Sequence, residues 1–181
     1  EIQLSYSGGK VLMSEPIVSR YSASSQKPNI VVLVLDSMMA QSVGCLNPEI
    51  EESNTPYIDA YFEDGRLFDN AYSVSEYTMP SMPTMLTGLY PIQHGIFTHS
   101  RCQREIPLTI PTLAETLQKN GYRTFCYSTA QSCVPPYGVY RGFESFYFHR
   151  RSMKDTCDRV VDRAMQFAEV HEHEPLFHFL H

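Results

Sequence analysis

The sequence predicts an α/β domain in three layers, with helices on both faces of a mainly parallel sheet. A β-branched apolar run occupies residues 30–35, and strand-like and helix-like segments alternate along the chain after it. The 181 residues are 43% apolar and only 19% charged, which is typical of a globular chain with a core. The alternation of strands and helices favours parallel strands joined by helical crossovers.

The first element is the strand predicted for residues 30–35, Ile-Val-Val-Leu-Val-Leu. The run lacks the alternation of apolar and polar residues that marks a half-exposed strand, so we expect it to be buried on both faces. It ends at Asp36. Because parallel α/β sheets bind ligands beyond the carboxyl ends of their strands, Asp36 is a candidate site residue.

A helix and a second strand are predicted next. Thr55-Pro56 can start a helix that runs to about residue 63, and Asp64-Gly65 can end it. Residues 66–71 then have the pattern of a strand.

The same order of helix and strand recurs further along the chain. A helix is predicted over residues 111–120, ended by Gly121, and a strand over residues 122–128. A loop around Pro135-Pro136 and an aromatic cluster at residues 143–148 follow. A last helix from about residue 154 to 170 leads to a core strand at residues 175–180.

Composition and charge narrow the possible partners. The chain has 14 Lys and Arg against 20 Asp and Glu, a net charge of −6, so we expect no nucleic-acid partner. A membrane span needs about 20 consecutive apolar residues, and the longest aliphatic run is residues 30–35, so no span is expected in this segment. The five cysteines form no CxxC pair, so we expect most of them to be reduced. A cytoplasmic location is favoured over a periplasmic or extracellular one, unless a targeting segment has been trimmed away.

The segment of residues 77–95 carries the most chemical information. Thr78 stands two residues before Pro80, and prolines are tolerated in a first helical turn. We expect a helix from about Thr78 to Thr87, capped by Gly88. A hydroxyl at a helix N-terminus is well placed for a nucleophile that attacks an anionic phosphoryl or sulfuryl group. The alternative is that Thr78 only caps the helix.

Several short blocks of the chain form a characteristic series. They are Pro28-Asn29-Ile30 through Asp36, Gly44-Cys45, Thr55-Pro56-Tyr57-Ile58-Asp59, Phe68-Asp69-Asn70-Ala71-Tyr72, Leu86-Thr87-Gly88-Leu89-Tyr90-Pro91 with His94-Gly95, Gly121-Tyr122-Arg123-Thr124 and Arg141-Gly142-Phe143. In this order the blocks resemble the sulfatase family of the alkaline phosphatase superfamily, and the resemblance implies an alkaline phosphatase-like fold. Residues 1–28 are then expected to be an arm or the tail of a preceding element. Residues 29–181 are expected to be the N-terminal portion of the domain, truncated at its C-terminus, with the remaining part beyond residue 181.

The resemblance assigns roles to two residues. Asp36 would ligate a divalent metal, with Ca, Mn, Mg and Zn all open, and Thr78 falls at the nucleophile position, where it would share that metal. Arylsulfatases carry there a formylglycine made from Cys or Ser. Thr cannot yield formylglycine by that oxidation, so the Thr oxygen would attack directly, as in phosphodiesterases and phosphotransferases of the superfamily.

Three departures from the arylsulfatase pattern argue against arylsulfatase activity for this chain. Ser37 replaces the second Asp of the Asp-Asp pair, Met82 replaces the arginine after the nucleophile motif, and the expected Gly-Lys with a nearby His is absent after residue 124. The resemblance thus implies a metal-dependent hydrolase or transferase of small sulfate or phosphate esters. The alternative is a catalytically inactive, sulfatase-like binding module.

The remaining candidates are substrate-binding residues. His181 follows the last predicted strand, where family members carry a His that leads into the site. Ser81 lies in the predicted Thr78 helix, and His94 follows this helix. His94 is expected mainly to brace the loop after this helix by a hydrogen bond. The basic side chains Arg141, Arg150, Arg151 and Lys154 are candidates for binding anions, with a solvated surface as the default.

Overall fold

The computed structural model describes residues 27–47, 49–97, 105–129, 137–148 and 156–181. Four strands form one sheet in the order β1-β4-β2-β3, and every neighbouring pair is parallel. The strands are β1 Ile30–Leu33, β2 Arg123–Ser128, β3 Ser145–Phe148 and β4 Leu176–Leu180. The helices are α1 Pro56–Phe62, α2 Thr78–Thr87, α3 Pro91–His94, α4 Leu113–Lys119 and α5 Thr156–Val170, and two short 3-10 helices span Ala40–Ser42 and Gly44–Leu46.

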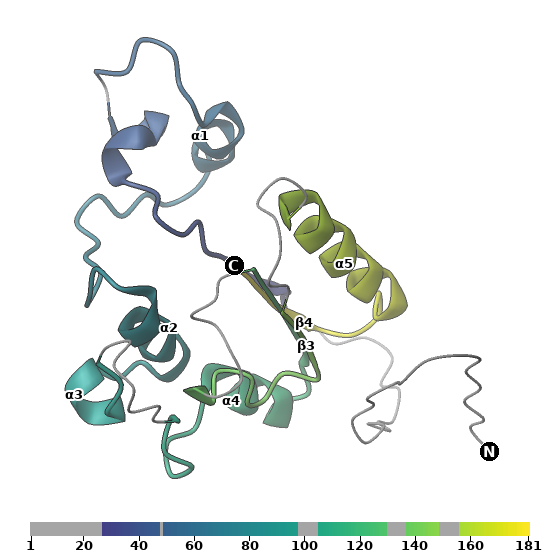
Figure 1. Ribbon diagram of the computed structural model, residues 1–181. Helices are drawn as coiled ribbons and strands as arrows, with labels where there is room; N and C mark the ends of the chain where they lie inside the picture. The colour runs from purple at the N-terminus through teal and green to yellow at the C-terminus, as the bar shows by residue number, and fades with distance from the viewer. Residues whose placement is uncertain (1–26, 48, 98–104, 130–136, 149–155) are drawn as a thin grey trace.

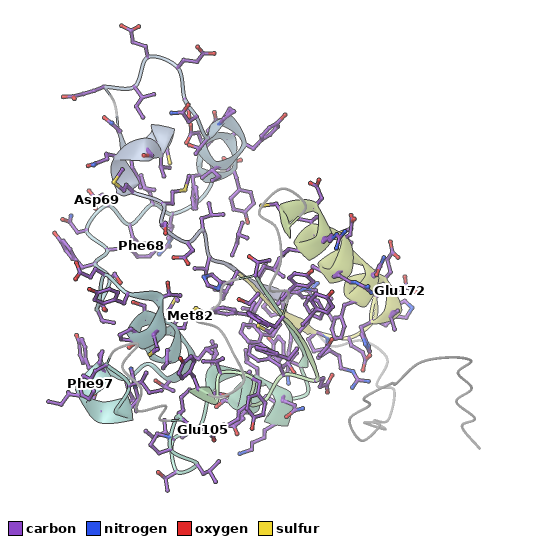
Figure 2. All side chains as sticks on the ribbon, viewed as in Figure 1. Phe68, Asp69, Met82, Phe97, Glu105 and Glu172 are labelled. Atoms are coloured by element: carbon purple, nitrogen blue, oxygen red, sulfur yellow. The ribbon has the colours of Figure 1, made fainter. Side chains whose placement is uncertain are left out.

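The sheet separates two apolar clusters. On one face, Met82 and Leu86 of α2 and Ala114 of α4 pack against Phe177 and Phe179 of β4. Met82 has no exposed surface and points from α2 toward the sheet (Figure 2). On the other face, Val160 and Ala164 of α5 pack against side chains of β2 and β4. Helices α2 and α4 thus lie on one side of the sheet and α5 on the other (Figure 1), which confirms the predicted three layers.

Most predicted elements are present. The strands at residues 122–128 and 175–180 correspond to β2 and β4, and the helices at 55–63, 111–120 and 154–170 correspond to α1, α4 and α5. Gly121, with φ +81°, lies just past α4 in the left-handed conformation that glycine adopts without steric cost. β4 is buried at all five positions because it lies between β1 and β2 with a helix layer on each face.

Two expectations about strands are wrong. Residues 66–71 form no strand; this segment is exposed, and Phe68 and Asp69 lie on the chain between α1 and α2, away from the sheet (Figure 2). β1 is not buried on both faces, because Val31 and Leu33 are 60% and 61% exposed. Alternate residues of β1 pack on the α2 side, whereas α5 packs over β2 and β4.

A third difference is the strand β3, because the sequence predicts only an aromatic cluster, and no strand, at residues 143–148. β3 pairs with β2 from Phe125↔Ser145 to Ser128↔Phe148. Of the cysteines in the described residues, Cys126 is buried, Cys45 is half-buried and Cys157 is exposed. No helix in the described part of the chain is long and apolar enough to span a membrane.

Candidate functional site

The carboxyl ends of three adjacent strands bring polar side chains together. Asp36 follows β1, His181 follows β4, and Ser128 is the last residue of β2. Backbone hydrogen bonds extend the ladder beyond the strands, from Val34 N to Leu180 O at 2.8 Å and from His181 N to Tyr127 O at 2.9 Å. The end of the sheet therefore holds these three side chains at defined positions, as expected where parallel sheets bind ligands.

Thr78 reaches this end of the sheet from α2. It is the first residue of the helix, and its Oγ1 lies 3.3 and 3.4 Å from the two carboxylate oxygens of Asp36. Tyr77, not Thr78, occupies the N-cap position, so the capping alternative does not describe this geometry. Gly88, with φ +70°, ends the helix as predicted. The hydroxyl thus lies beside a carboxylate and at the positive end of a helix dipole.

These side chains line a cavity of about 600 Å³. Asp36, Thr78, Ser81 and His181 all contribute to its wall. The lining is acidic at Asp36 and Glu76, and among the described residues that form it there is no Lys or Arg. An anionic ester would therefore meet negative charge from the described lining, and none of the described lining residues offsets it with a basic side chain.

Backbone strain occurs next to Asp36. Ser37 has a φ of +61°. In the part of the chain that the structure describes, it is the only non-glycine residue with a positive φ. Such conformations are unfavourable for residues with a side chain, and they are found more often at functional sites than elsewhere. A turn at residues 36–37 follows β1, and the Asp36 carboxylate of this turn meets Thr78 of α2.

Ser81 and His94 take different positions. The Ser81 hydroxyl lines the cavity but donates to the carbonyls of Tyr77 and Ser75, at 2.9 and 3.2 Å, so it also stabilises the chain entering α2. His94 is buried; its Nε2 lies 3.0 Å from Thr84 Oγ1, and its Nδ1 accepts from Ile96 N at 3.2 Å. It is not among the residues that line the cavity, and its contacts are those expected of a bracing residue.

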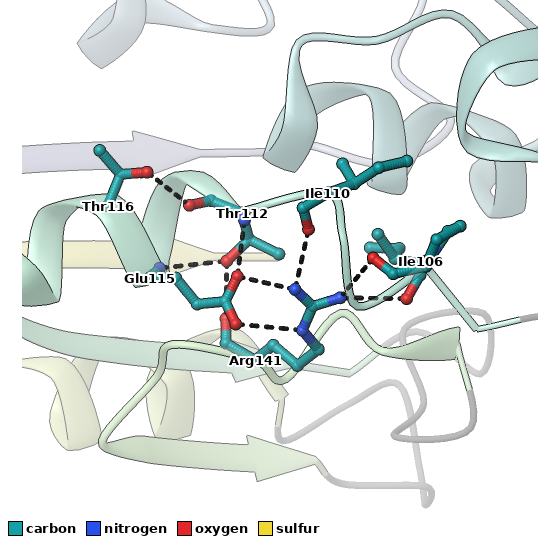
Figure 3. A network of polar contacts seen from close by, with 7 residues as sticks. Ile106, Ile110, Thr112, Glu115, Thr116 and Arg141 are labelled. Atoms are coloured by element: carbon teal, nitrogen blue, oxygen red, sulfur yellow. Dashed lines mark hydrogen bonds and ion pairs between the residues drawn. The ribbon is translucent and has the colours of Figure 1, made fainter.

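Arg141 is neither on the surface nor in the cavity. Its guanidinium donates to both carboxylate oxygens of Glu115, at 3.1 and 2.8 Å, and to the carbonyls of Ile106, Pro107 and Ile110 (Figure 3). The side chain is only 9% exposed. The expectation that Arg141 binds anions or is solvated is wrong, because every donor direction shown is taken by groups of the protein itself. Arg150, Arg151 and Lys154 lie outside the described residues.

The side chains at the site include donors suited to a divalent metal ion. Asp36 and Thr78 supply oxygen ligands of the kind that hard cations prefer. In the part of the chain that the structure describes, no group of three or more His, Cys, Asp or Glu side chains is placed to hold an ion. The donors present therefore fit a divalent cation in chemistry and proximity, but they supply only part of a coordination shell.

Ser128 was missed by the sequence reasoning. Its Oγ lies 3.0 Å from His181 Nδ1 and fixes the position of the imidazole. The only sequence signal is that Ser128 is the last residue of a predicted strand. That signal does not say which other strand lies beside the strand of Ser128.

A sequence model of the sulfatase family matches residues 28–181. The Ulvan-active sulfatase of Formosa agariphila is 31% identical over 128 residues, which is 71% of this chain and 24% of the relative. The N-acetylgalactosamine-6-sulfatase of Homo sapiens is 36% identical over 111 residues, 56% of this chain and 21% of the relative. The chain spans about a quarter of the length of these curated relatives.

Two solved structures share the fold. One, in complex with its substrate D-glucosamine-2-N,6-O-disulfate, has a TM-score of 0.67 and 21% identity, and covers 85% of this chain and 34% of its own. The other, in complex with a neocarrahexaose, has a TM-score of 0.65 and 20% identity, and covers 85% of this chain and 44% of its own. At these identities the likeness concerns the fold.

Proposed function

This chain belongs to the sulfatase family, and from that premise we propose that it hydrolyses sulfate esters with Thr78 as nucleophile and a divalent metal held in part by Asp36. Its fold is the alkaline phosphatase-like α/β fold. The observation that carries the proposal is the position of Thr78 Oγ1, 3.3 Å from the Asp36 carboxylate, at the start of α2 and on the wall of the cavity.

The proposed reaction uses the geometry of these two residues. Sulfatases generally use a divalent metal, and when bound between Asp36 and Thr78 such an ion would lower the pKa of the hydroxyl and offset the charge of the substrate. The Thr78 oxygen attacks the sulfur, and the alcohol oxygen of the ester leaves and takes up a proton. The free N–H groups at the start of α2 can donate to the developing negative charge. Water then cleaves the Thr78 sulfate ester, releases sulfate and restores the hydroxyl.

Phosphate esters are the second candidate substrate class, because the residue at the nucleophile position is a hydroxyl amino acid that cannot form formylglycine. A Thr oxygen attacks phosphorus by the same in-line geometry, and an acceptor alcohol in place of water would make the reaction a transfer. The relatives and neighbours named above include enzymes and complexes of sulfated sugars. Sulfated saccharides are accordingly the first substrates to test.

The experiment compares Thr78→Ala, Thr78→Ser and the matched control Thr87→Ala, which removes a threonine hydroxyl from the other end of α2. The Thr87 hydroxyl donates within its own helix, to Pro83 O at 2.7 Å. Each protein is assayed on sulfated saccharides, aryl sulfates, phosphate monoesters and phosphodiesters, with Ca²⁺, Mn²⁺, Mg²⁺ or Zn²⁺ added.

We expect Thr78→Ala to lose activity by at least about 1,000-fold, because the covalent step is removed, while Thr87→Ala stays near wild type and Thr78→Ser retains most activity. Mass spectrometry of rapidly quenched enzyme should find a sulfuryl or phosphoryl group on Thr78. Full activity of Thr78→Ala on every substrate that wild type turns over would eliminate Thr78 as the nucleophile. Absence of turnover together with absence of bound metal would favour the inactive binding module instead.

A further inference from the structure

One imidazole nitrogen at the site is buried and has no hydrogen-bond partner among the residues that the structure describes. The side chain of His181 is 1% exposed. Within the described part of the chain, its Nε2 atom has no donor or acceptor at hydrogen-bond distance. Leaving a buried polar atom unpaired costs about 1 to 3 kcal/mol, so an orphaned nitrogen beside a candidate site points to a ligand.

The rest of the His181 residue is firmly held. Its Nδ1 lies 3.0 Å from Ser128 Oγ, its backbone N donates to Tyr127 O at 2.9 Å, and its carbonyl accepts from Thr129 N at 3.0 Å. With one ring nitrogen and the backbone fixed by β2, the imidazole cannot turn freely. Its Nε2 is left facing Asp36, 3.7 Å from Oδ2.

We infer that His181 Nε2 is a nitrogen ligand of the same metal that Asp36 and Thr78 hold, with Ser128 as the residue that positions its ring. This inference rests on the proposed metal site. Donors that share one ion at bond lengths of about 2.0 to 2.6 Å lie roughly 3 to 4 Å apart. Asp36 lies 3.3 Å from Thr78 Oγ1 and 3.7 Å from His181 Nε2, so both distances are compatible with a shared ion.

The Ser128 contact supports the same assignment. A metal-binding histidine commonly uses its second ring nitrogen in a hydrogen bond that fixes the tautomer and the ring orientation. If Nδ1–H donates to Ser128 Oγ, then Nε2 carries the lone pair and faces Asp36. The competing arrangement is an ion pair of protonated His181 with Asp36, which needs no metal.

A nitrogen ligand restricts the choice of ion. Ca²⁺ and Mg²⁺ are bound by oxygen donors, whereas Zn²⁺ and Mn²⁺ accept imidazole, Zn²⁺ more strongly. The mixed set of Asp36, Thr78 and His181 therefore favours Zn²⁺ over Ca²⁺. Loss of the imidazole should weaken Zn²⁺ binding far more than Ca²⁺ binding.

The chain offers a matched control in His178, three residues earlier on the same strand. Its Nε2 is also buried and unpaired in the described part of the chain. Its ring lies on the opposite face of the sheet, with centroids 5.4 Å from Phe125 and 5.7 Å from Phe167. Replacing His178 thus removes a buried histidine from β4 without touching the proposed site.

The experiment measures Zn²⁺ and Ca²⁺ binding by titration calorimetry for wild type, His181→Ala, Ser128→Ala, His178→Ala and Asp36→Ala, with circular dichroism to check folding. We expect His181→Ala to lower Zn²⁺ affinity by at least about 100-fold and Ser128→Ala by roughly 10- to 100-fold, since loss of a ligand's hydrogen-bond partner alone has that effect. His178→Ala should bind as wild type does, and the ratio of Zn²⁺ to Ca²⁺ affinity should fall only in the first two variants.

The outcomes separate this inference from the proposed function. Unchanged Zn²⁺ affinity in folded His181→Ala and Ser128→Ala, with binding lost in Asp36→Ala, would overturn the role of His181 and leave the Asp36 site intact. Ca²⁺ binding that depends on Asp36, without Zn²⁺ binding, would do the same. Absence of any metal binding by wild type would overturn both the inference and the metal-dependent mechanism.

Discussion

Replacing Arg141 by Met should be among the most destabilising single changes in the described part of this protein. The guanidinium ties the segment around residues 106–110 to α4 through its bonds to Glu115 and to three backbone carbonyls. Met fills a similar volume without any donor. The variant therefore leaves the Glu115 carboxylate and those carbonyls without their partner.

The size of the effect follows from burial. Removing one member of a buried ion pair costs about 3 to 5 kcal/mol because the other charge is left uncompensated. Glu115 is 26% exposed, so water recovers part of that loss, and we take the lower end, about 3 kcal/mol. For a domain of this size that corresponds to a fall of roughly 6 to 12 °C in melting temperature.

Urea denaturation followed by circular dichroism measures the free energy of unfolding of Arg141→Met and wild type. The control is Arg66→Met, which changes an exposed arginine and should stay within about 0.5 kcal/mol of wild type. Glu115→Gln is the informative second background, because Gln keeps the reciprocal hydrogen bonds at Thr112 that begin α4 but removes the charge. Arg141→Met should cost clearly less in that background. A cost below about 0.5 kcal/mol in the wild-type background would refute the structural role of Arg141.

Three further predictions concern stability. In denaturant unfolding, Gly142→Ala should lower the free energy of unfolding by well over twice as much as Gly88→Ala. Both glycines have a positive φ, but only at Gly142 would an added Cβ meet the backbone, 2.1 Å from Glu115 N. Similar losses in the two variants would contradict the close packing at Gly142. Burial raises the pKa of Glu115, but Arg141 and the Thr112 N–H outweigh it and hold that pKa below the usual value. Its contribution to stability is therefore complete above the ordinary glutamate pKa and is lost as pH falls through the lowered value, and Glu115→Gln should flatten the acid limb of an unfolding-versus-pH curve. Burial lowers the pKa of His94, so wild type should lose stability as pH falls below about 6.5, and an unchanged slope in His94→Gln would contradict this.

The elements that could be predicted from sequence are those with local signals. β4 is a run of five buried residues, four of them apolar, and this composition predicts a core strand. α2 spans Thr78–Thr87 with Gly88 as its C-cap. The glycine predicts this end, whereas the two prolines place the start near Thr78 without fixing it. These features depend on residues within one helical turn or one strand, so the sequence contains them directly.

The elements that could not be predicted depend on a distant partner. Residues 66–71 have the apolar content of a strand, yet no neighbouring strand supplies hydrogen bonds in the described structure, and Phe68 is 75% exposed. β3 is the opposite case, because the aromatic cluster at residues 143–148, for which the sequence predicts no strand, forms a parallel ladder with β2. Strand formation requires a second chain segment, and its identity is not written in the local pattern.

The candidate site likewise combines residues that local signals predict with a contact that depends on a distant segment. Asp36 and Thr78 each lie at the end of an element, so both could be predicted singly, but the contact of Ser128 with His181 depends on strand register. Tyr127 pairs with Leu180, which places Ser128 beside His181 in the next step of the ladder. In this register Phe177 and Phe179 face α2 and α4, and His181 follows them to the same side, whereas His178 faces α5. A slip of one residue would exchange the two histidines between the faces and empty the site of its imidazole. The packing of Phe177 and Phe179 against α2 therefore does more than stabilise the core, since it also determines which histidine reaches Asp36.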